Sequence, residues 1–295
     1  ALLGWYYGRG NARTGMTLQF VIHLVDIALS ILFVYGFGWG IFGAALGTVL
    51  GQVAAAMLGL WFVARHYGGV RKVLSLIRPA ELLDATGVRR MLGLSRDLMI
   101  RSIALMSAYT FFAAQGSRLG EVALSSNAIL LNLLMISGYF LDGTAQAAEA
   151  LCGKAVGANY RPAYERAYVL SMQWGVVIAV GLSLLWLFGG TVVIDFMTTS
   201  EPVRDYARDF LWIAAIASLS GMPSFIYDGV LIGSTLNATM RNGMVVALAF
   251  FLVACVTLQP LIGNLGLWLA LHAFFIVRSI YYWAALERTK ARLFT

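Results

Sequence analysis

Apolar residues occupy long runs along this chain, and short polar segments separate them. About eight of these runs approach or exceed the length that a helix needs to cross a hydrocarbon core about 30 Å thick. They lack the alternation of apolar and polar residues that is typical of membrane-spanning strands. The pattern predicts an all-α, polytopic membrane helix bundle. The predicted spans are Met16 to Phe37, Phe42 to His66, Leu98 to Ala114, Val122 to Leu141, Tyr168 to Phe188, Phe210 to Ile232, Met244 to Leu258, and Leu261 to Ala285.

Composition and charge support a membrane protein and give it an orientation. The chain is 60% hydrophobic and 12% charged, and its net charge is +7. Because the basic residues gather in alternate loops, the positive-inside rule places both termini in the cytoplasm. We expect a multi-pass protein of the cytoplasmic (inner) membrane. We therefore expect the positively charged loops to lie beside a lipid bilayer, and we expect no nucleic-acid partner. The basic groups are Arg9 and Arg13, then Arg65 to Arg96, then Lys154, Arg161 and Arg166, then Arg241, and finally Arg288, Lys290 and Arg292.

Motifs for enzymatic or cofactor chemistry are missing from the sequence. Cys152 and Cys255 lie in different apolar segments without CxxC spacing, and the three histidines are scattered. The sequence therefore predicts neither a metal site nor a disulfide framework. It contains no Gly-x-Ser-x-Gly and no Walker-type phosphate loop. We expect a protein that is not an enzyme and has no cofactor.

Two segments near the start of the chain resemble two segments near its end. Gly8 to Met16 resembles Gly233 to Met244, and Gly38 to Ala45 resembles Gly263 to Ala270. Both pairs lie in the same order, as a same-orientation duplication requires. The last six spans then form one complete six-helix lobe, residues 91–295. Residues 1–90 are interpreted as the last part of an N-terminal six-helix lobe and a cytoplasmic loop, with roughly four missing N-terminal helices expected upstream, in the same protein or in a separate chain.

A run of small residues, Asp142 to Asn159, carries two carboxylates. Small residues let neighbouring helices approach closely in a bilayer. Asp142 and Glu149 are two helical turns apart and fall on one face, near the cytoplasmic end of their span. We expect them to have gating or structural roles, with Glu149 in a salt bridge or a gate.

Several blocks in order resemble the MATE (multidrug and toxic compound extrusion) family, in its DinF-like branch. The resemblance covers essentially the whole chain. It implies about twelve helices in two lobes around a central cavity, of which about eight are here. It also implies a cation-coupled antiporter that alternates between inward-open and outward-open states. The blocks are Arg96 to Arg101, Ala114 to Gly120, Asn127 to Asn132, Leu141 to Ala158, Asp228 to Gly233, Met240 to Asn242, and Gly266 to Ala270.

Asp26 is one candidate for the coupling chemistry, because a carboxylate at membrane depth is costly when it is ionised. Helical spacing puts Asp26 and Ser30 on one face and His23 within one turn, where the three could share H⁺ or Na⁺. The family usually has Asn and Asp where this chain has Asp26 and Ser30. By the same resemblance, Thr48 matches a threonine that lines the family's N-lobe cation site. The alternative is a hydrogen bond between helices without coupling.

Asp228 is the second candidate. It follows Pro223, which frees a carbonyl and kinks the helix, so Tyr227 and Asp228 are expected to line a cavity. The alternative is that Asp228 pairs with Arg101 or Arg278 to hold helices together. Arg101 is also expected in an interfacial ion-pair cluster with Arg96 and Asp97, or within reach of the cavity.

These residues lead to one functional hypothesis and two alternatives. The first is an antiporter driven by H⁺ or Na⁺ that exports amphipathic or cationic drugs or toxic metabolites, with Asp26 and Asp228 exchanging cation for substrate. Its partners would be small organic cations. One alternative is a lipid-linked precursor flippase, whose cavity usually holds several cations where this chain offers mainly Arg101 and Arg278. The other is a non-transporting membrane scaffold.

Overall fold

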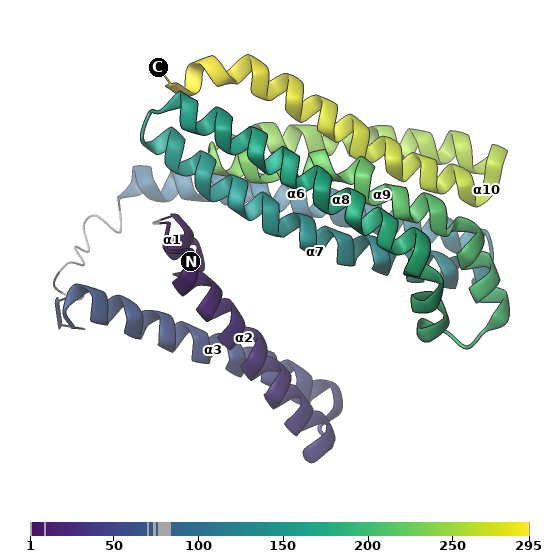
Figure 1. Cartoon of the computed structure of the whole chain (residues 1–295), viewed down its shortest axis with the longest axis horizontal. Helices are drawn as coiled ribbons and strands as arrows, with labels where there is room; N and C mark the ends of the chain where they lie inside the picture. Colours follow the sequence, from purple (N-terminus) through teal and green to yellow (C-terminus); the bar gives the residue numbers. More distant parts are fainter. Residues whose placement is uncertain (1, 9, 70, 73–74, 76–83, 295) are drawn as a thin grey trace. The chain divides into compact units, whose positions relative to one another are not determined.

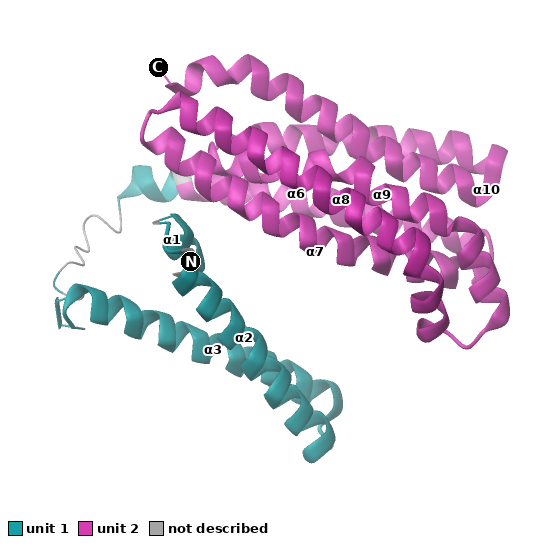
Figure 2. Cartoon of the chain, viewed as in Figure 1, with its two compact units in different colours: residues 1–90 teal, residues 91–295 magenta. Residues whose placement is uncertain are grey.

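The computed structural model describes residues 2–8, 10–69, 71–72, 75 and 84–294, and every regular element within them is a helix. The chain divides into two compact units, Ala1–Arg90 and Met91–Thr295 (Figure 2). Seven helices of the described residues are long and apolar enough to cross a membrane. The all-α class is therefore confirmed. The assignment of the first unit to a larger six-helix lobe stays a prediction.

The first unit is built on a hairpin of two long helices (Figure 1). Its elements are α1 (Leu2–Gly8), α2 (Ala12–Ile31), the π-helical turn η1 (Leu32–Gly36) and α3 (Gly40–Tyr67). Asn11 caps α2, because its side-chain oxygen accepts a hydrogen bond from the Thr14 N–H at 3.3 Å. Gly38 and Gly40 have φ of 69° and 51°, values that favour glycine, and they make the tight reversal into α3.

A row of small residues joins the two helices of this hairpin. Gly43, Gly47, Gly51, Ala55 and Gly59 recur every fourth position on α3 and are all buried. A Cβ added at Gly47 would lie 2.6 Å from the Ser30 hydroxyl oxygen. The missing side chains therefore let α3 approach the polar face of α2, as small residues do between membrane helices.

The second unit contains α6 (Ala85–Arg118, from Met91 onward), α7 (Glu121–Gly157), α8 (Arg161–Met197), α9 (Glu201–Gly233), α10 (Asn237–Thr289) and the 3₁₀ turn η2 (Lys290–Phe294). Helix α10 breaks at Ile262 and Gly263, whose backbone angles are not helical. Its two arms run back along each other, since Gly243 lies against the ring of Tyr282 and Gly266 against the backbone of Leu258. Helix α10 therefore holds the last two predicted spans, and all eight predicted spans are helical apart from Phe37 and the break at Ile262 and Gly263.

The small-residue run of α7 packs closely against a neighbouring helix, as the sequence predicted, and that neighbour is α9. Ala145, Ala148 and Cys152 are buried along one face of α7. A Cβ on Gly229 of α9 would overlap the Ala145 carbonyl oxygen, and one on Gly233 would overlap the carbonyl oxygen of the residue one turn further along α7. The two backbones are therefore in direct contact.

The resemblance between the two ends of the chain is visible in the backbone. The Gly10 N–H donates to the carbonyl three residues earlier at 2.9 Å, and the Thr235 N–H does the same at 2.9 Å. Gly10 and Thr235 both have positive φ, 74° and 57°. Gly38 and Gly263 repeat the match at the far turn, with φ of 69° and 58°. Both pairs are 225 positions apart, 235 minus 10 and 263 minus 38, so both hairpins begin and reverse at equivalent points.

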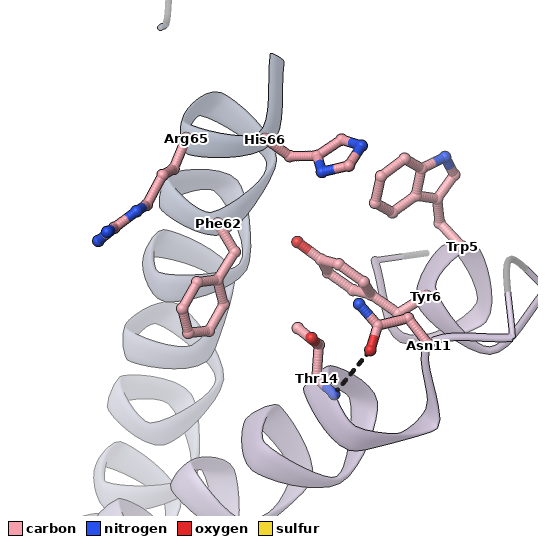
Figure 3. Close-up of a pocket in the computed structure, with 7 residues that line it drawn as sticks. All are labelled: Trp5, Tyr6, Asn11, Thr14, Phe62, Arg65 and His66. Atoms are coloured by element: carbon pink, nitrogen blue, oxygen red, sulfur yellow. Dashed lines mark hydrogen bonds between the residues drawn. The ribbon is translucent and has the colours of Figure 1, made fainter. Parts of the chain in front are cut away.

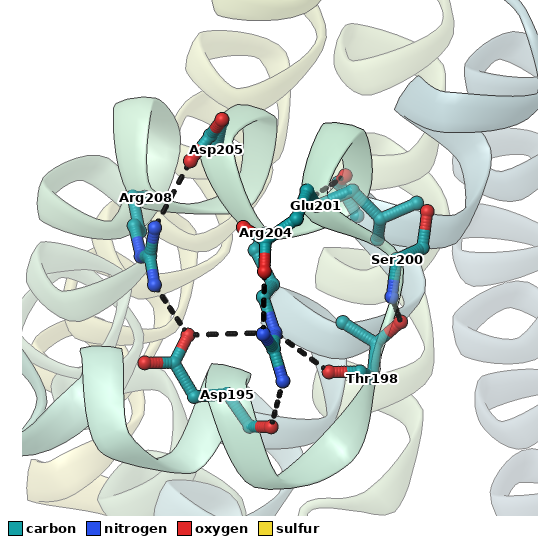
Figure 4. Close-up of polar contacts among 9 residues, drawn as sticks. Asp195, Thr198, Ser200, Glu201, Arg204, Asp205 and Arg208 are labelled. Atoms are coloured by element: carbon teal, nitrogen blue, oxygen red, sulfur yellow. Dashed lines mark hydrogen bonds and ion pairs between the residues drawn. The ribbon is translucent and has the colours of Figure 1, made fainter.

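An ion-pair network closes the connection between α8 and α9 (Figure 4). Arg204 donates to the carbonyl oxygens of Asp195 and Thr198, both at 2.8 Å. Arg208 donates to the Asp195 carboxylate at 2.6 Å. Arg204 thus satisfies carbonyls at the end of α8 that have no partner inside the helix, and Arg208 pairs with the Asp195 side chain.

Candidate functional site

The hairpin of the first unit brings Asp26, Ser30 and Thr48 together. Thr48 Oγ1 of α3 donates to Asp26 Oδ1 at 2.9 Å, and Ser30 Oγ, one turn along α2, donates to the same oxygen at 3.2 Å. Thr48 follows Gly47 in the row of small residues, so the close helix contact is what brings its hydroxyl within reach of Asp26.

A backbone carbonyl completes this group of oxygens. The Ala44 carbonyl lies 3.4 Å from Ser30 Oγ and 3.2 Å from Thr48 Oγ1. We call these three oxygens, together with Asp26 Oδ1, the oxygen cluster. Within the described part of the chain, no donor reaches the other oxygen of Asp26. Oxygen ligands are those that hard cations prefer.

His23 does not join the oxygen cluster. Its Nε2 lies 3.1 Å from Gln19 Nε2 on an exposed part of α2. Of the three side chains that were expected to share a cation, the structure brings Asp26 and Ser30 together and leaves His23 apart. Thr48 joins Asp26 and Ser30. No group of three or more His, Cys, Asp and Glu side chains that could hold a metal occurs in the described ranges.

In the second unit, Asp228 lies between two arginines. Arg278 Nη2 of α10 donates to Asp228 Oδ2 at 3.1 Å, and Arg101 of α6 forms an ion pair with the same oxygen. This arrangement is the alternative that we expected for Asp228 from the sequence, and both arginines take part. We call the three residues the charged cluster.

The charged cluster is buried and holds two cations to one anion. Asp228 is 5% exposed and Arg278 is 1% exposed. Arg278 is surrounded by the rings of Phe225, Phe274 and Tyr282, whose centroids lie 5.6 to 5.9 Å from the guanidinium carbon. These side chains link α6, α9 and α10, and removal of the carboxylate would leave buried positive charge uncompensated.

Tyr227 points away from the charged cluster. Its hydroxyl lies 2.9 Å from the hydroxyl of Tyr168 on α8. Neighbouring helical positions face directions about 100° apart, so Tyr227 and Asp228 contact different helices. Helix α9 continues through Pro223. A common cavity for Tyr227 and Asp228 stays a prediction.

The ion-pair cluster expected around Asp97 differs from the sequence prediction. Asp97 pairs with Arg241 at 2.7 Å and with Arg96 at 3.4 Å, whereas Arg101 bonds to Asp228 instead. The expected cluster was wrong for Arg101, because α6 turns that side chain toward α9.

The carboxylates of α7 have no ion-pair partner within the described residues. Asp142 is exposed and Glu149 is half-buried. Neither forms a side-chain hydrogen bond or ion pair there, so the expected salt bridge of Glu149 is absent from that part of the chain. A gating role for either residue stays a prediction.

Sequence reasoning missed a buried polar network in the second unit. Asn127 of α7 donates to Asn264 at 2.7 Å and accepts from the Trp268 indole N–H at 2.9 Å. His272 lies between the Ser220 hydroxyl at 2.8 Å and a backbone carbonyl at 3.1 Å. The signal was available, since isolated polar residues inside apolar spans need partners in a membrane.

The first unit also contains a cavity of about 390 Å³ where α1, α2 and α3 meet (Figure 3). Figure 3 shows the rings of Tyr6 and His66 directed toward it and the guanidinium of Arg65 directed away. Tyr6 is anchored by a hydrogen bond from its hydroxyl to the Gly59 carbonyl at 3.2 Å. This cavity is separate from the oxygen cluster.

Comparison with known proteins gives the family. The MatE family model matches residues 98–261. The chain is 34% identical over 283 residues to DNA damage-inducible protein F of Escherichia coli (strain K12), a match that covers 95% of this chain and 60% of that protein. It is 21% identical over 249 residues to the multidrug export protein MepA of Staphylococcus aureus, across 82% of this chain and 54% of MepA.

A solved structure has the same fold. A mutant of the Vibrio cholerae MATE transporter VcmN superposes with a TM-score of 0.84 at 17% identity, over 98% of this chain and 65% of that one. The chain thus spans about two thirds of the length of these relatives or less. The likeness extends to a multi-pass helical membrane fold whose known members are transporters and not enzymes. The chain therefore belongs to the MatE family.

Proposed function

We propose that the chain works in a secondary antiporter of the cytoplasmic membrane, which exports amphipathic or cationic organic molecules in exchange for H⁺ or Na⁺. The oxygen cluster is the observation that carries this function. It places a carboxylate and two hydroxyls between two apolar helices. There an ionised carboxylate is unfavourable in free energy, whereas a neutralised one is much less so.

The two hydroxyls of the oxygen cluster have a choice of acceptor. When Asp26 is ionised, Ser30 and Thr48 donate to it. When H⁺ or Na⁺ neutralises the carboxylate, the same hydroxyls turn to the Ala44 carbonyl, which is already within 3.4 Å of both. Cation binding at Asp26 of α2 would thus change which oxygen accepts the hydrogen bond from Thr48 of α3. This change of hydrogen-bond acceptor can be linked to the change between inward-open and outward-open states.

The charged cluster is the proposed second exchange point. A cationic substrate at Asp228 must replace one of its arginines. The Arg101 side chain is 21% exposed, whereas that of Arg278 is 1% exposed and enclosed by aromatic rings. We therefore assign Arg101 as the partner that the substrate displaces and Arg278 as the fixed one.

Orientation and the alternatives complete the proposal. Both termini are assigned to the cytoplasm from the loop charges. In the flippase alternative, a pyrophosphate would need free cations, but Arg101 and Arg278 are both engaged by Asp228. This observation favours the antiporter.

The test is dye efflux from liposomes that contain the full-length protein, under an imposed pH gradient or an imposed sodium gradient. We expect efflux from the wild type and its loss in Asp26→Asn, which keeps the shape of the side chain but not its charge. Thr48→Val removes one hydroxyl and should reduce efflux partly. Asp209→Asn, at an exposed carboxylate outside both clusters, is the matched control.

Two outcomes would overturn the proposal. If no lipophilic cation leaves the liposomes under either gradient, the flippase or the scaffold becomes the better explanation. If Asp26→Asn transports as well as Asp209→Asn, the oxygen cluster is a hydrogen bond between helices without coupling. Equal melting temperatures of the variants would exclude unfolding as the cause of a loss.

A further inference from the structure

A groove of about 590 Å³ runs between the two arms of α10, wholly within the second unit. Its first arm contributes large apolar side chains, and its second arm contributes apolar and small ones with a cation at the end. The residues that define it are Val246 and Phe250 on the first arm, and Val277, Ile280, Ala284 and Arg288 on the second.

The shape of the groove follows from helical spacing. Val277, Ile280, Ala284 and Arg288 recur at intervals of three and four, so they share one face of the second arm over roughly 16 Å. Alanine at 284 creates the hollow. The rim is open, because Ile280 is 57% exposed and Phe250 on the facing arm is 58% exposed. The groove is thus narrow, apolar and open to the surroundings of a membrane-spanning helix.

Charge is confined to one end of this groove. Arg288 is the charged residue that lines it, and it makes no hydrogen bond or ion pair with any residue that the structure describes. The adjacent Glu287 lies 3.9 Å from Lys290, which also reaches Glu165 at 3.5 Å. The nearby acids are therefore engaged elsewhere, and the guanidinium of Arg288 is left for a ligand.

A second polar group faces the same way. Tyr281 lines the groove two turns before Arg288, and its hydroxyl has no hydrogen-bond partner in the described ranges. Together with Trp283, which is 53% exposed, it gives this end of α10 the aromatic character of a membrane–water interface.

We propose that the groove binds one anionic membrane phospholipid. One acyl chain lies along Val246, Phe250 and Ile280, and the phosphate accepts hydrogen bonds from Arg288. A guanidinium binds phosphate with two parallel hydrogen bonds, and a cation at the membrane surface discriminates lipids by their charge. This site is separate from the oxygen cluster and the charged cluster, so it stands independently of the transport cycle.

The experiment is native mass spectrometry of the purified full chain in detergent, titrated with phosphatidylglycerol, phosphatidylcholine or inorganic phosphate. We expect saturable one-to-one binding of phosphatidylglycerol, about fivefold tighter than that of phosphatidylcholine. Arg288→Gln should remove this fivefold preference, and Arg288→Lys should keep part of it. Ala284→Trp should fill the groove and weaken both lipids.

Lys154→Gln is the matched control. Lys154 is exposed at the end of α7, and its replacement removes the same single charge without altering the lining of the groove. Equal binding of the two lipids to the wild type, or equal loss in Arg288→Gln and Lys154→Gln, would overturn the proposal. Full competition by inorganic phosphate would also overturn it, because the ligand would then be a free anion. So would a dimer that Ala284→Trp dissociates while lipid binding stays unchanged.

Discussion

A methyl group at Gly229 should separate α7 from α9. In Gly229→Ala the new Cβ would overlap the Ala145 carbonyl oxygen and lie 2.7 Å from its carbonyl carbon. Both of these atoms belong to backbone, so neither can rotate aside as a side chain would. Carbon atoms in good contact are about 3.5–4.0 Å apart, and the two helices must therefore part by on the order of 1 Å.

The expected cost is the difference between two effects. Overpacking of a close contact costs about 1–3 kcal/mol. Alanine in a helix is about 1 kcal/mol more favourable than glycine, which offsets part of it. Gly143→Ala on α7 isolates the contact, because nothing lies within 4 Å of a Cβ built at Gly143. Both variants share the propensity gain, so the difference between them is the overpacking cost of about 1–3 kcal/mol.

Thermal unfolding in detergent, followed by circular dichroism, is the assay. We expect Gly229→Ala to melt below Gly143→Ala by roughly 2–4 °C for each kcal/mol. Gly143→Ala should melt at or above the wild-type temperature. Equal melting of the two variants would refute the close backbone contact between α7 and α9.

Three further substitutions test other contacts. Asp228→Asn leaves the buried Arg278 without the carboxylate that pairs with it and should destabilise the chain by about 3–5 kcal/mol in chemical unfolding, whereas Glu165→Gln at an exposed pair should not; equal effects would contradict the buried ion pair. Tyr227→Phe removes one hydrogen bond, so about 1 kcal/mol of stability should be lost while dye efflux stays unchanged, and a loss of efflux would instead place Tyr227 in the transport path. Gly47→Ala should push α3 away from α2 and lower gradient-driven efflux, and wild-type efflux would show that the close approach is unnecessary.

Much of the fold could be predicted from the sequence, because a bilayer requires long apolar helices. The eight runs lie in helices, and the turn near the end was expected between Leu258 and Leu261 but occurs at Ile262 and Gly263. Gly263 has φ of 58°, and hydropathy does not detect backbone angles. The predicted turn between the last two spans was therefore displaced by a few residues from the observed break inside α10.

The candidate sites were predicted less completely. Asp26 and Ser30 share a face by local spacing, whereas Thr48 was identified through the family resemblance. For Asp228, the sequence offered two arginines as alternatives, 127 and 50 positions away, and both bind it. Tyr227 was grouped with Asp228 because both follow Pro223, which was expected to kink the helix and open a cavity. Adjacent residues of a helix point in directions about 100° apart. Only the packing against α8 and α10 shows that Tyr227 faces Tyr168 and that Asp228 faces Arg278.

The charged cluster also has a consequence for how the chain is made. A ribosome adds about 5–20 residues per second, so Arg101 emerges roughly 6–25 s before Asp228, which follows it by 127 positions. During that time α6 carries an arginine inside its apolar span without its carboxylate partner, which is unfavourable in a bilayer. Arg278 emerges last, when its carboxylate partner is already in place. Biogenesis therefore depends on the arrival of α9, and the loss of Asp228 would lower the yield of inserted protein before it altered any finished molecule.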